Sequence, residues 1–146
     1  MSDFRRLSES VLASPQLSVD EVMAASAMGV KLIVNNRPEG ESDDQTPGAA
    51  IEAAARAAGI DYLAIPVTPG TFDQGQVTAM GAALSRTDGK VLAYCRTGTR
   101  STLLWALAQA ANGEQVETIA SAAAAAGYDV SPILPAMAEL STRARR

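Results

Sequence analysis

Short apolar runs alternate along the chain with longer segments of helical character. The runs are rich in Val, Ile and Leu and end at turn residues, which is typical of buried strands. They span residues 11–13, 31–35, 61–67 and 90–95. Strands that alternate with helices through short connections predict a parallel central sheet with helices on both faces. The expected fold class is therefore α/β, and we expect a single domain over residues 1–146.

Capping and stop residues mark the helices between the runs. Ser18 and Glu21 fit a capping box, as do Thr71 and Gln74. Pro47 stands at the favoured first position of a helix. Glycines and turn residues indicate the ends. The expected helices span residues 18–29, 46–59, 71–87, 102–111 and 114–126, and a last helix begins at 132.

The connections that follow three of the strands are the expected place for a functional site. In open α/β sheets, sites form beyond the carboxyl ends of the strands. The connections at that edge are residues 35–46, 67–73 and 95–101. Cys95, the only cysteine in the chain, ends the most convincing strand and therefore lies on this edge.

The segment CRTGTRS, residues 95–101, has the composition of an anion-binding loop. A loop between a strand and a helix can turn its N–H groups inward, and the helix adds its positive end. Gly98 permits a backbone conformation that side chains disfavour, and the guanidinium of Arg100 can bind an oxyanion through two hydrogen bonds. The loop is therefore expected to stabilise a nucleophilic thiolate on Cys95. The expected substrate-binding residues are Arg96, Thr97, Gly98, Thr99 and, on an adjacent connection, Arg37.

Composition narrows the class of protein. The chain has 146 residues, of which 47% are hydrophobic and 19% charged, with a net charge of −4. This balance is typical of a globular domain and gives no basic surface for nucleic acid. No signal peptide or membrane-spanning run is visible, and a single cysteine fits a reducing compartment, so we expect a cytoplasmic protein.

The chain contains no histidine. A Ser-His-Asp triad, a Cys-His pair and a His-rich metal site are therefore excluded within the chain, and we expect no metal and no cofactor. A dithiol cycle is excluded as well, because Cys95 has no second cysteine to pair with. Activation of the thiol must come from backbone dipoles and arginines.

A general acid is harder to assign. Asp73 lies on the connection after residues 61–67 and is a candidate, but an acidic residue at the start of a helix also stabilises that helix. The other candidates are the acids of the connection 35–46, which as a group fit a solvated acidic loop. They are Glu39, Glu41, Asp43 and Asp44. Arg37 either reaches the pocket or pairs with these acids.

Several segments resemble a known family. CRTGTRS resembles the Cys-x4-Arg loop of rhodanese-type sulfurtransferases. Together with VNNRPEGE, IEAAARAAGIDYLAIPV and VLAYCRTGTRSTLLWAL, it resembles the bacterial beta-lactamase-hydrolase-like protein, phosphatase-like domain, over about residues 4–130. The resemblance implies a fold similar to the tyrosine and dual-specificity phosphatases. Members are sometimes labelled sulfur transferases, and some relatives are fused to a domain resembling persulfide dioxygenases, which implies a persulfide-oxidising partner protein.

Protein tyrosine phosphatases resemble one another in a His-Cys-x5-Arg signature, and this loop differs from it. Tyr94 stands in place of the histidine, and only four residues separate Cys95 from Arg100. A shorter loop makes a tighter cradle, which favours a persulfide over a tetrahedral phosphate. Thiol-to-thiol sulfur transfer also needs no dedicated acid.

Three hypotheses follow. The first is a sulfurtransferase, in which Cys95 takes sulfur from a small anionic donor and passes it to a thiol acceptor. The alternative is a phosphatase, in which Cys95 forms a phosphocysteine, Arg100 binds the phosphoryl oxygens and Ser101 assists departure of the thiolate. The third is a non-catalytic module that binds anions or changes redox state. Neither nucleic acid nor a membrane is an expected partner.

Overall fold

The structure is a computed structural model that describes residues 2–145. A five-stranded sheet has the order β1-β2-β5-β3-β4, in which β1 is antiparallel to β2 and the other neighbours are parallel. The strands are β1 Arg5–Arg6, β2 Val11–Ser14, β3 Val30–Asn35, β4 Asp61–Ala64 and β5 Lys90–Tyr94. The helices are α1 Val19–Ala27, α2 Gly48–Ala57, α3 Gln74–Arg86, α4 Thr99–Ala111, α5 Val116–Ala125, η1 Ser131–Ile133 and α6 Leu134–Ala144.

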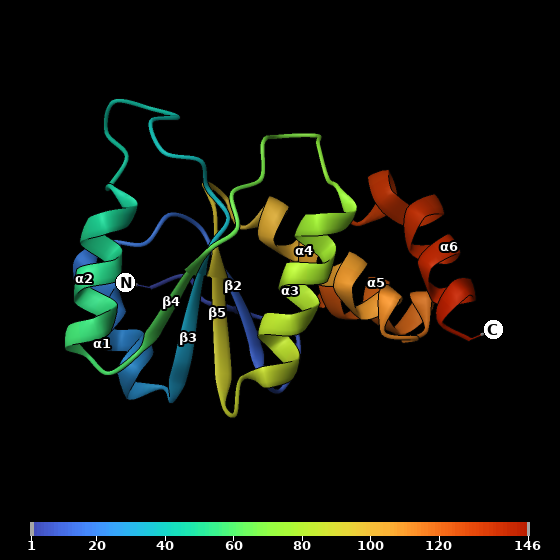
Figure 1. Cartoon of the computed structure of the whole chain (residues 1–146), viewed down its shortest axis with the longest axis horizontal. Coiled ribbons are helices and arrows are strands. Elements are labelled where there is room, and N and C mark those ends of the chain that lie inside the picture. Colours follow the sequence, from blue (N-terminus) through green and yellow to red (C-terminus); the bar gives the residue numbers. More distant parts are fainter. Residues whose placement is uncertain (1, 146) are drawn as a thin grey trace.

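Helices cover both faces of the sheet, as the alternating pattern predicts. Figure 1 shows α1 and α2 on one face and α3 and α4 on the other, with α5 and α6 beyond α4. Each face has its own apolar cluster. Successive side chains of β5 alternate between them, since Val91 and Ala93 join the cluster under α4 and Leu92 and Tyr94 join the cluster under α1 and α2.

Several boundaries differ from the sequence prediction. The strand expected at 61–67 ends at Ala64, because the chain then turns along the β3 end, where Ile65 and Val67 donate to the carbonyls of Asn35 and Asn36. The capping box of α3 uses Asp73 and Gln76, two residues after the predicted pair. Pro47 is the N-cap of α2 and not its first helical residue. The short strand β1 was not predicted.

Helix α4 begins at Thr99, three residues before the predicted start. Arg100 and Ser101 therefore lie in its first turn and not in a loop. The helix is buried on most of its surface because it packs against the sheet, α3, α5 and α6. Its N-terminus is consequently held firmly at the edge where β5 ends.

Within residues 2–145, each helix is too short or too polar to cross a lipid bilayer.

Candidate active site

Four connections meet at the carboxyl ends of the parallel strands. Three of them were predicted, and the fourth is the segment that links β2 to α1. Gln16 on this fourth segment donates its N–H to the carbonyl of Arg96 at 3.2 Å. The Gln16 side chain accepts from Arg37 at 3.0 Å, so it joins the Cys95 loop to the connection after β3.

Cys95 is the first residue after β5 and is completely buried. Its Sγ accepts a hydrogen bond from the N–H of Gly98 at 3.1 Å. Gly98 is the N-cap of α4 with a φ of 92°, a conformation that glycine adopts without strain. The chain thus turns sharply back so that a backbone N–H points at the sulfur.

The remaining N–H groups of this turn are available to a ligand. Within residues 2–145, four of them have no hydrogen-bond acceptor in the protein: those of Arg96, Thr97, Arg100 and Ser101. Unpaired N–H groups at a helix N-terminus favour an anion, because they add to the positive end of the helix dipole. The anion-binding role of this loop stays a prediction, and these four N–H groups are the donors that it would use.

Arg100 is held so that one edge of its guanidinium stays open. Its Nη1 donates to the carbonyl of Val67 and to Oε2 of Glu41, both at 2.7 Å, and its Nη2 donates to Oε1 of Glu41 at 2.9 Å. In the described part of the chain, Nε and the second proton of Nη2 have no acceptor. These two N–H groups lie side by side and form the fork that binds carboxylates and phosphates.

Glu41 bridges two arginines. Its Oε1 also accepts from Nε of Arg37 at 2.9 Å, and the Arg37 side chain is only 4% exposed. The hydrogen bonds from Arg100, with a smaller contribution from Arg37, hold the pKa of Glu41 below its usual range. Of the two alternatives for Arg37, pairing with the acidic connection is the one observed.

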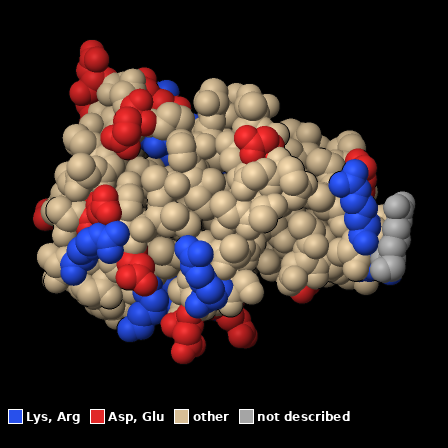
Figure 2. Space-filling view, in the orientation of Figure 1, with Lys and Arg blue, Asp and Glu red and all other residues tan. Residues whose placement is uncertain are grey.

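Glu41 differs from the other acids of the connection after β3 because its side chain pairs with two arginines. Figure 2 shows acidic side chains gathered on the protruding connection between β3 and α2. Glu41 belongs to that connection, yet its side chain is only 19% exposed and contacts Arg100 in the first turn of α4. No local pattern could have separated it from its acidic neighbours, because the distinction depends on which side chain reaches α4.

Ser101 is held by a residue that sequence reasoning missed. Its hydroxyl donates to Oδ1 of Asn36 at 2.8 Å, and both side chains are fully buried. Asn36 in turn donates through Nδ2 to the carbonyl of Ile65 at 2.9 Å. A signal did exist, since a pair of asparagines directly follows an apolar strand at the predicted functional edge.

The comparisons with known proteins bear on this geometry. The family model of the beta-lactamase hydrolase-like protein, phosphatase-like domain, matches residues 3–112. The chain belongs to this family.

A beta-lactamase hydrolase-like protein of Xylella fastidiosa (strain Temecula1) is 33% identical over 120 residues, which cover 80% of this chain and 28% of that relative. The phosphatase-like domain therefore spans little more than a quarter of the length of the curated relatives it matches. Among solved structures, a Neisseria meningitidis Z2491 protein with the provisional name of a phosphatase is 31% identical. It matches with a TM-score of 0.84 over 96% of this chain and 99% of that one.

A structure of Tk-PTP in its active form matches with a TM-score of 0.75 at 16% identity and covers 97% of both chains. This likeness shows the fold, and it confirms the predicted tyrosine-phosphatase-like architecture. The family and the Neisseria protein are phosphatase-like and give no support to the predicted preference for sulfur transfer. They favour the phosphatase alternative.

Asp73 lies at the start of α3 and lines a different hollow of the surface. Its Oδ1 accepts from the N–H of Gln76 at 2.8 Å as the cap of α3. It lines a hollow of about 220 Å³ together with residues of α4 and α6, among them Leu107 and Arg143. The role of Asp73 as a general acid stays a prediction. The contact that the structure shows is the cap of α3.

Tyr94 and the loop hydroxyls complete the set of predicted positions. Tyr94 lies in the core between the sheet and the α1–α2 layer, and burial raises the pKa of its phenol. Thr97 and Thr99 are exposed and hydrogen-bonded to each other at 3.0 Å. Arg96 is also exposed, so its side chain is free to meet a ligand at the rim.

Tyr128 is a second residue that the sequence did not single out. Its hydroxyl donates to the carbonyl of Thr97 at 3.2 Å, and burial raises the pKa of the phenol. It packs so closely on Gly98 that a Cβ there would overlap the phenol oxygen. The segment after α5 therefore supports the Cys95 loop from outside the sheet.

Proposed function

We propose that this domain is a cysteine-dependent phosphatase that works through a phosphocysteine on Cys95. The observation that carries the proposal is that three kinds of group come from one short segment of the chain. A buried thiol, the unpaired N–H groups of its loop and the open fork of Arg100 all belong to one strand-to-helix turn. The phosphatase-like family and the Neisseria relative support the same class of reaction.

The reaction has two steps. The thiolate of Cys95 attacks phosphorus, the bond from phosphorus to the leaving oxygen breaks, and the leaving group departs with the electron pair. Water then attacks the phosphocysteine, the S–P bond breaks and inorganic phosphate leaves. The Arg100 fork and the loop N–H groups stabilise the phosphoryl oxygens, whose charge distribution changes in both transition states.

Ser101 and Asn36 belong to the second step. A hydroxyl that donates to the departing thiolate would ease the break of the S–P bond. The Ser101 proton is bonded to Asn36, so the hydroxyl has to rotate about its C–O bond to serve the sulfur. We infer that Asn36 fixes the position of the oxygen from which that rotation starts.

The test is hydrolysis of an aryl phosphate by wild type, Cys95→Ser and Arg100→Lys. Wild type is expected to turn over many equivalents and Cys95→Ser none. Arg100→Lys keeps the charge but loses the fork, so its kcat/KM should fall by about 100-fold or more. Equal rates for wild type and Cys95→Ser would sink the proposal.

One observation keeps sulfur transfer as a second candidate: four residues, and not five, separate Cys95 from Arg100. On this hypothesis Cys95 would carry a persulfide and pass it to a thiol acceptor, with a persulfide-oxidising protein as a partner. Incubation with thiosulfate and cyanide separates the two. Thiocyanate formation that depends on Cys95, without turnover of any phosphate ester, would favour sulfur.

A purely binding role is the third hypothesis. It predicts that phosphate or vanadate binds to the wild-type protein while both assays remain without turnover. Multiple turnovers in either assay exclude it.

A further inference from the structure

Arg37 is buried at the start of the connection that follows β3. Its side chain is only 4% exposed, and all three guanidinium nitrogens donate hydrogen bonds within the protein. The acceptors are Oε1 of Glu41 at 2.9 Å, Oε1 of Gln16 at 3.0 Å and Oγ of Ser42 at 3.1 Å. A guanidinium enclosed in this way is poorly placed to touch a substrate, and its contacts favour a role inside the protein.

The first of these contacts leads to Arg100. Oε1 of Glu41 accepts from Nε of Arg37 and from Nη2 of Arg100, both at 2.9 Å, so one oxygen joins the two guanidinium groups. Oε2 of Glu41 accepts from Nη1 of Arg100 at 2.7 Å. A carboxylate that is held by a buried partner has a fixed plane, and a two-bonded pair with that carboxylate fixes the plane of the second guanidinium as well. Arg37 therefore helps to set which edge of Arg100 stays open.

The second contact leads to the backbone of the Cys95 loop. Gln16 accepts from Arg37 through its side chain and donates its own N–H to the carbonyl of Arg96 at 3.2 Å. The C=O and the following N–H of a trans peptide unit point in opposite directions. The hold on this carbonyl therefore turns the N–H of Thr97 away from Gln16. Within residues 2–145, this N–H is one of the loop donors that have no acceptor.

The next peptide unit of the loop shows the consequence of such a hold. Its carbonyl, on Thr97, accepts from the Tyr128 hydroxyl at 3.2 Å, and its N–H, on Gly98, donates to Sγ of Cys95 at 3.1 Å. A donor outside the loop that holds the carbonyl thus goes with an N–H that points at the sulfur. Gln16 is the equivalent outside donor for the preceding peptide unit.

We propose that Arg37 is a positioning residue for the oxyanion donors of the Cys95 site. Through its carboxylate partner it fixes the open edge of Arg100, and through Gln16 it fixes the peptide unit between residues 96 and 97. The inference rests on the proposed phosphatase function and adds a residue that acts without touching the substrate. Donors that are already oriented stabilise the changing charge of the phosphoryl oxygens without reorganisation. Loss of Arg37 should therefore lower kcat more than it raises KM.

Arg37→Lys tests this role, because lysine keeps the positive charge but has one nitrogen in place of three. We expect kcat/KM for phenyl phosphate to fall about tenfold or more, with most of the loss in kcat. Gln16→Met removes the side-chain acceptor, keeps the backbone N–H and should give a smaller loss of the same kind. Thermal unfolding shows whether each variant is folded at the assay temperature, and Gln16→Met decides the outcome if Arg37→Lys is not.

A double-mutant cycle shows whether Arg37 acts through Arg100. Independent effects on kcat/KM multiply, whereas effects that share one route do not. In the Arg100→Lys background the fork is already lost, so Arg37→Lys should cost at least about threefold less than it costs in wild type. The loss that remains belongs to the Gln16 contact. A general loss of structure would instead lower kcat/KM by the same factor in both backgrounds.

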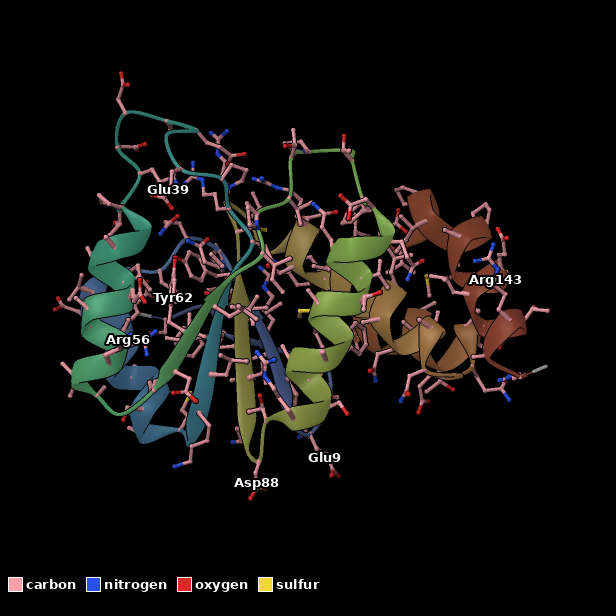
Figure 3. The ribbon with its side chains drawn as sticks, viewed as in Figure 1. Glu9, Glu39, Arg56, Tyr62, Asp88 and Arg143 are labelled. Carbon is pink, nitrogen blue, oxygen red and sulfur yellow. The ribbon has the colours of Figure 1, made fainter. Side chains whose placement is uncertain are left out.

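Arg56→Lys is the matched control. Arg56 and Arg37 each pair with a glutamate four residues away, but the Arg56 side chain is 57% exposed. Figure 3 shows Arg56 near the end of α2 that lies away from the connection after β3. Arg56→Lys should leave kcat and KM unchanged, both in wild type and in the Arg100→Lys background.

The outcomes separate the inference from the proposed function. Equal factors of loss in the two backgrounds, or a wild-type kcat in both Arg37→Lys and Gln16→Met, overturn the positioning role and leave the phosphatase intact. A rise in KM with kcat unchanged overturns it as well, since that pattern is expected of a residue that binds the substrate and its transition state equally. No Cys95-dependent turnover of phenyl phosphate by wild type overturns the phosphatase and the inference that rests on it.

Discussion

Single residues at the site differ in whether their polar atoms are satisfied. Arg100 uses one edge of its guanidinium to bind Glu41 and the Val67 carbonyl and leaves the other edge open. In the described part of the chain, the buried hydroxyl of Tyr94 has no partner in good hydrogen-bond geometry, although the Tyr62 phenol lies close enough to raise the pKa of Tyr94. The open edge of Arg100 is ready to bind a ligand, whereas the buried Tyr94 hydroxyl lowers the stability of the fold.

Glu41→Gln tests the value of the Glu41 bridge. The change removes a charged partner from Arg37 and Arg100, and we expect a loss of about 1–3 kcal/mol in the free energy of unfolding at pH 7. Because the pKa of Glu41 is lowered in the folded protein, this difference is fully present above the ordinary value of 4.5. It should shrink as the pH falls through the lower pKa of the folded state.

Urea unfolding of both proteins between pH 7 and pH 3 measures the effect. Glu52→Gln is the control, since Glu52 pairs with Arg56 on an exposed helix surface and should matter little. A difference between wild type and Glu41→Gln that does not depend on pH would contradict the assigned ion pair.

Tyr94→Phe should leave the protein equally stable or more stable by up to about 1 kcal/mol, since it removes an unpaired buried hydroxyl. Thermal unfolding measures this. Tyr62→Phe is the contrast, because the Tyr62 hydroxyl accepts from Asn35 at 2.9 Å and its loss should destabilise. A clear loss of stability in Tyr94→Phe would mean that its hydroxyl has a partner.

At the scale of elements, the turn from β5 into α4 makes the site. The strand carries Cys95 to the edge of the sheet, and the first turn of α4 carries Arg100 and Ser101. Gly98 joins them with a φ of 92°, and Tyr128 and the backbone of Ser14 occupy the space that a Cβ at this position would need. The turn is thus the place where backbone conformation and packing both demand glycine.

Gly98→Ala should destabilise the protein by about 1–3 kcal/mol, because alanine resists this φ and its Cβ would overlap Tyr128. Activity should fall with it, as the N–H of residue 98 moves away from the sulfur. Gly81→Ala in α3 is the matched control. A Cβ there meets nothing within 4 Å, so the helix should gain roughly 0.5–1 kcal/mol. Equal stability of Gly98→Ala and wild type would contradict the turn geometry.

At the scale of the whole molecule, β1 and the segment after α5 meet at Tyr128, which contacts the Cys95 loop. Tyr128, beyond the matched region of 3–112, donates to the Thr97 carbonyl. Arg5 of β1 stacks over the Tyr128 ring at 5.1 Å from its centroid and donates to the Ala126 carbonyl. The edge strand and the α5–η1 connection therefore hold the loop through one tyrosine.

Tyr128→Phe removes the hydrogen bond to Thr97 and keeps the ring. We expect a loss of about 1 kcal/mol in stability and a lower kcat for phenyl phosphate, because the loop gains freedom. Ser141→Ala in α6 loses the hydrogen bond from the Ser141 hydroxyl to the Glu114 carbonyl, and it should cost similar stability and leave kcat unchanged. The same kcat in Tyr128→Phe as in wild type would show that this support does not serve catalysis.

Most of the fold was predictable from local pattern. Strands buried between helices are visible in the sequence as short apolar runs between helical segments. The sheet edge that carries Cys95 and the glycine turn after it were therefore predictable. The sequence prediction was wrong mainly at element boundaries, such as the start of α4 and the cap of α3, where tertiary contacts shift an element by two or three residues.

By itself, the sequence determined the α/β alternation, the nucleophile candidate and the loop that surrounds it, because each rests on neighbours within a few residues. Only the tertiary structure decided that Glu41 joins Arg100 and that Asn36 holds Ser101. These contacts join segments up to 65 residues apart. They depend on how the strand ends meet in space, which no local period encodes.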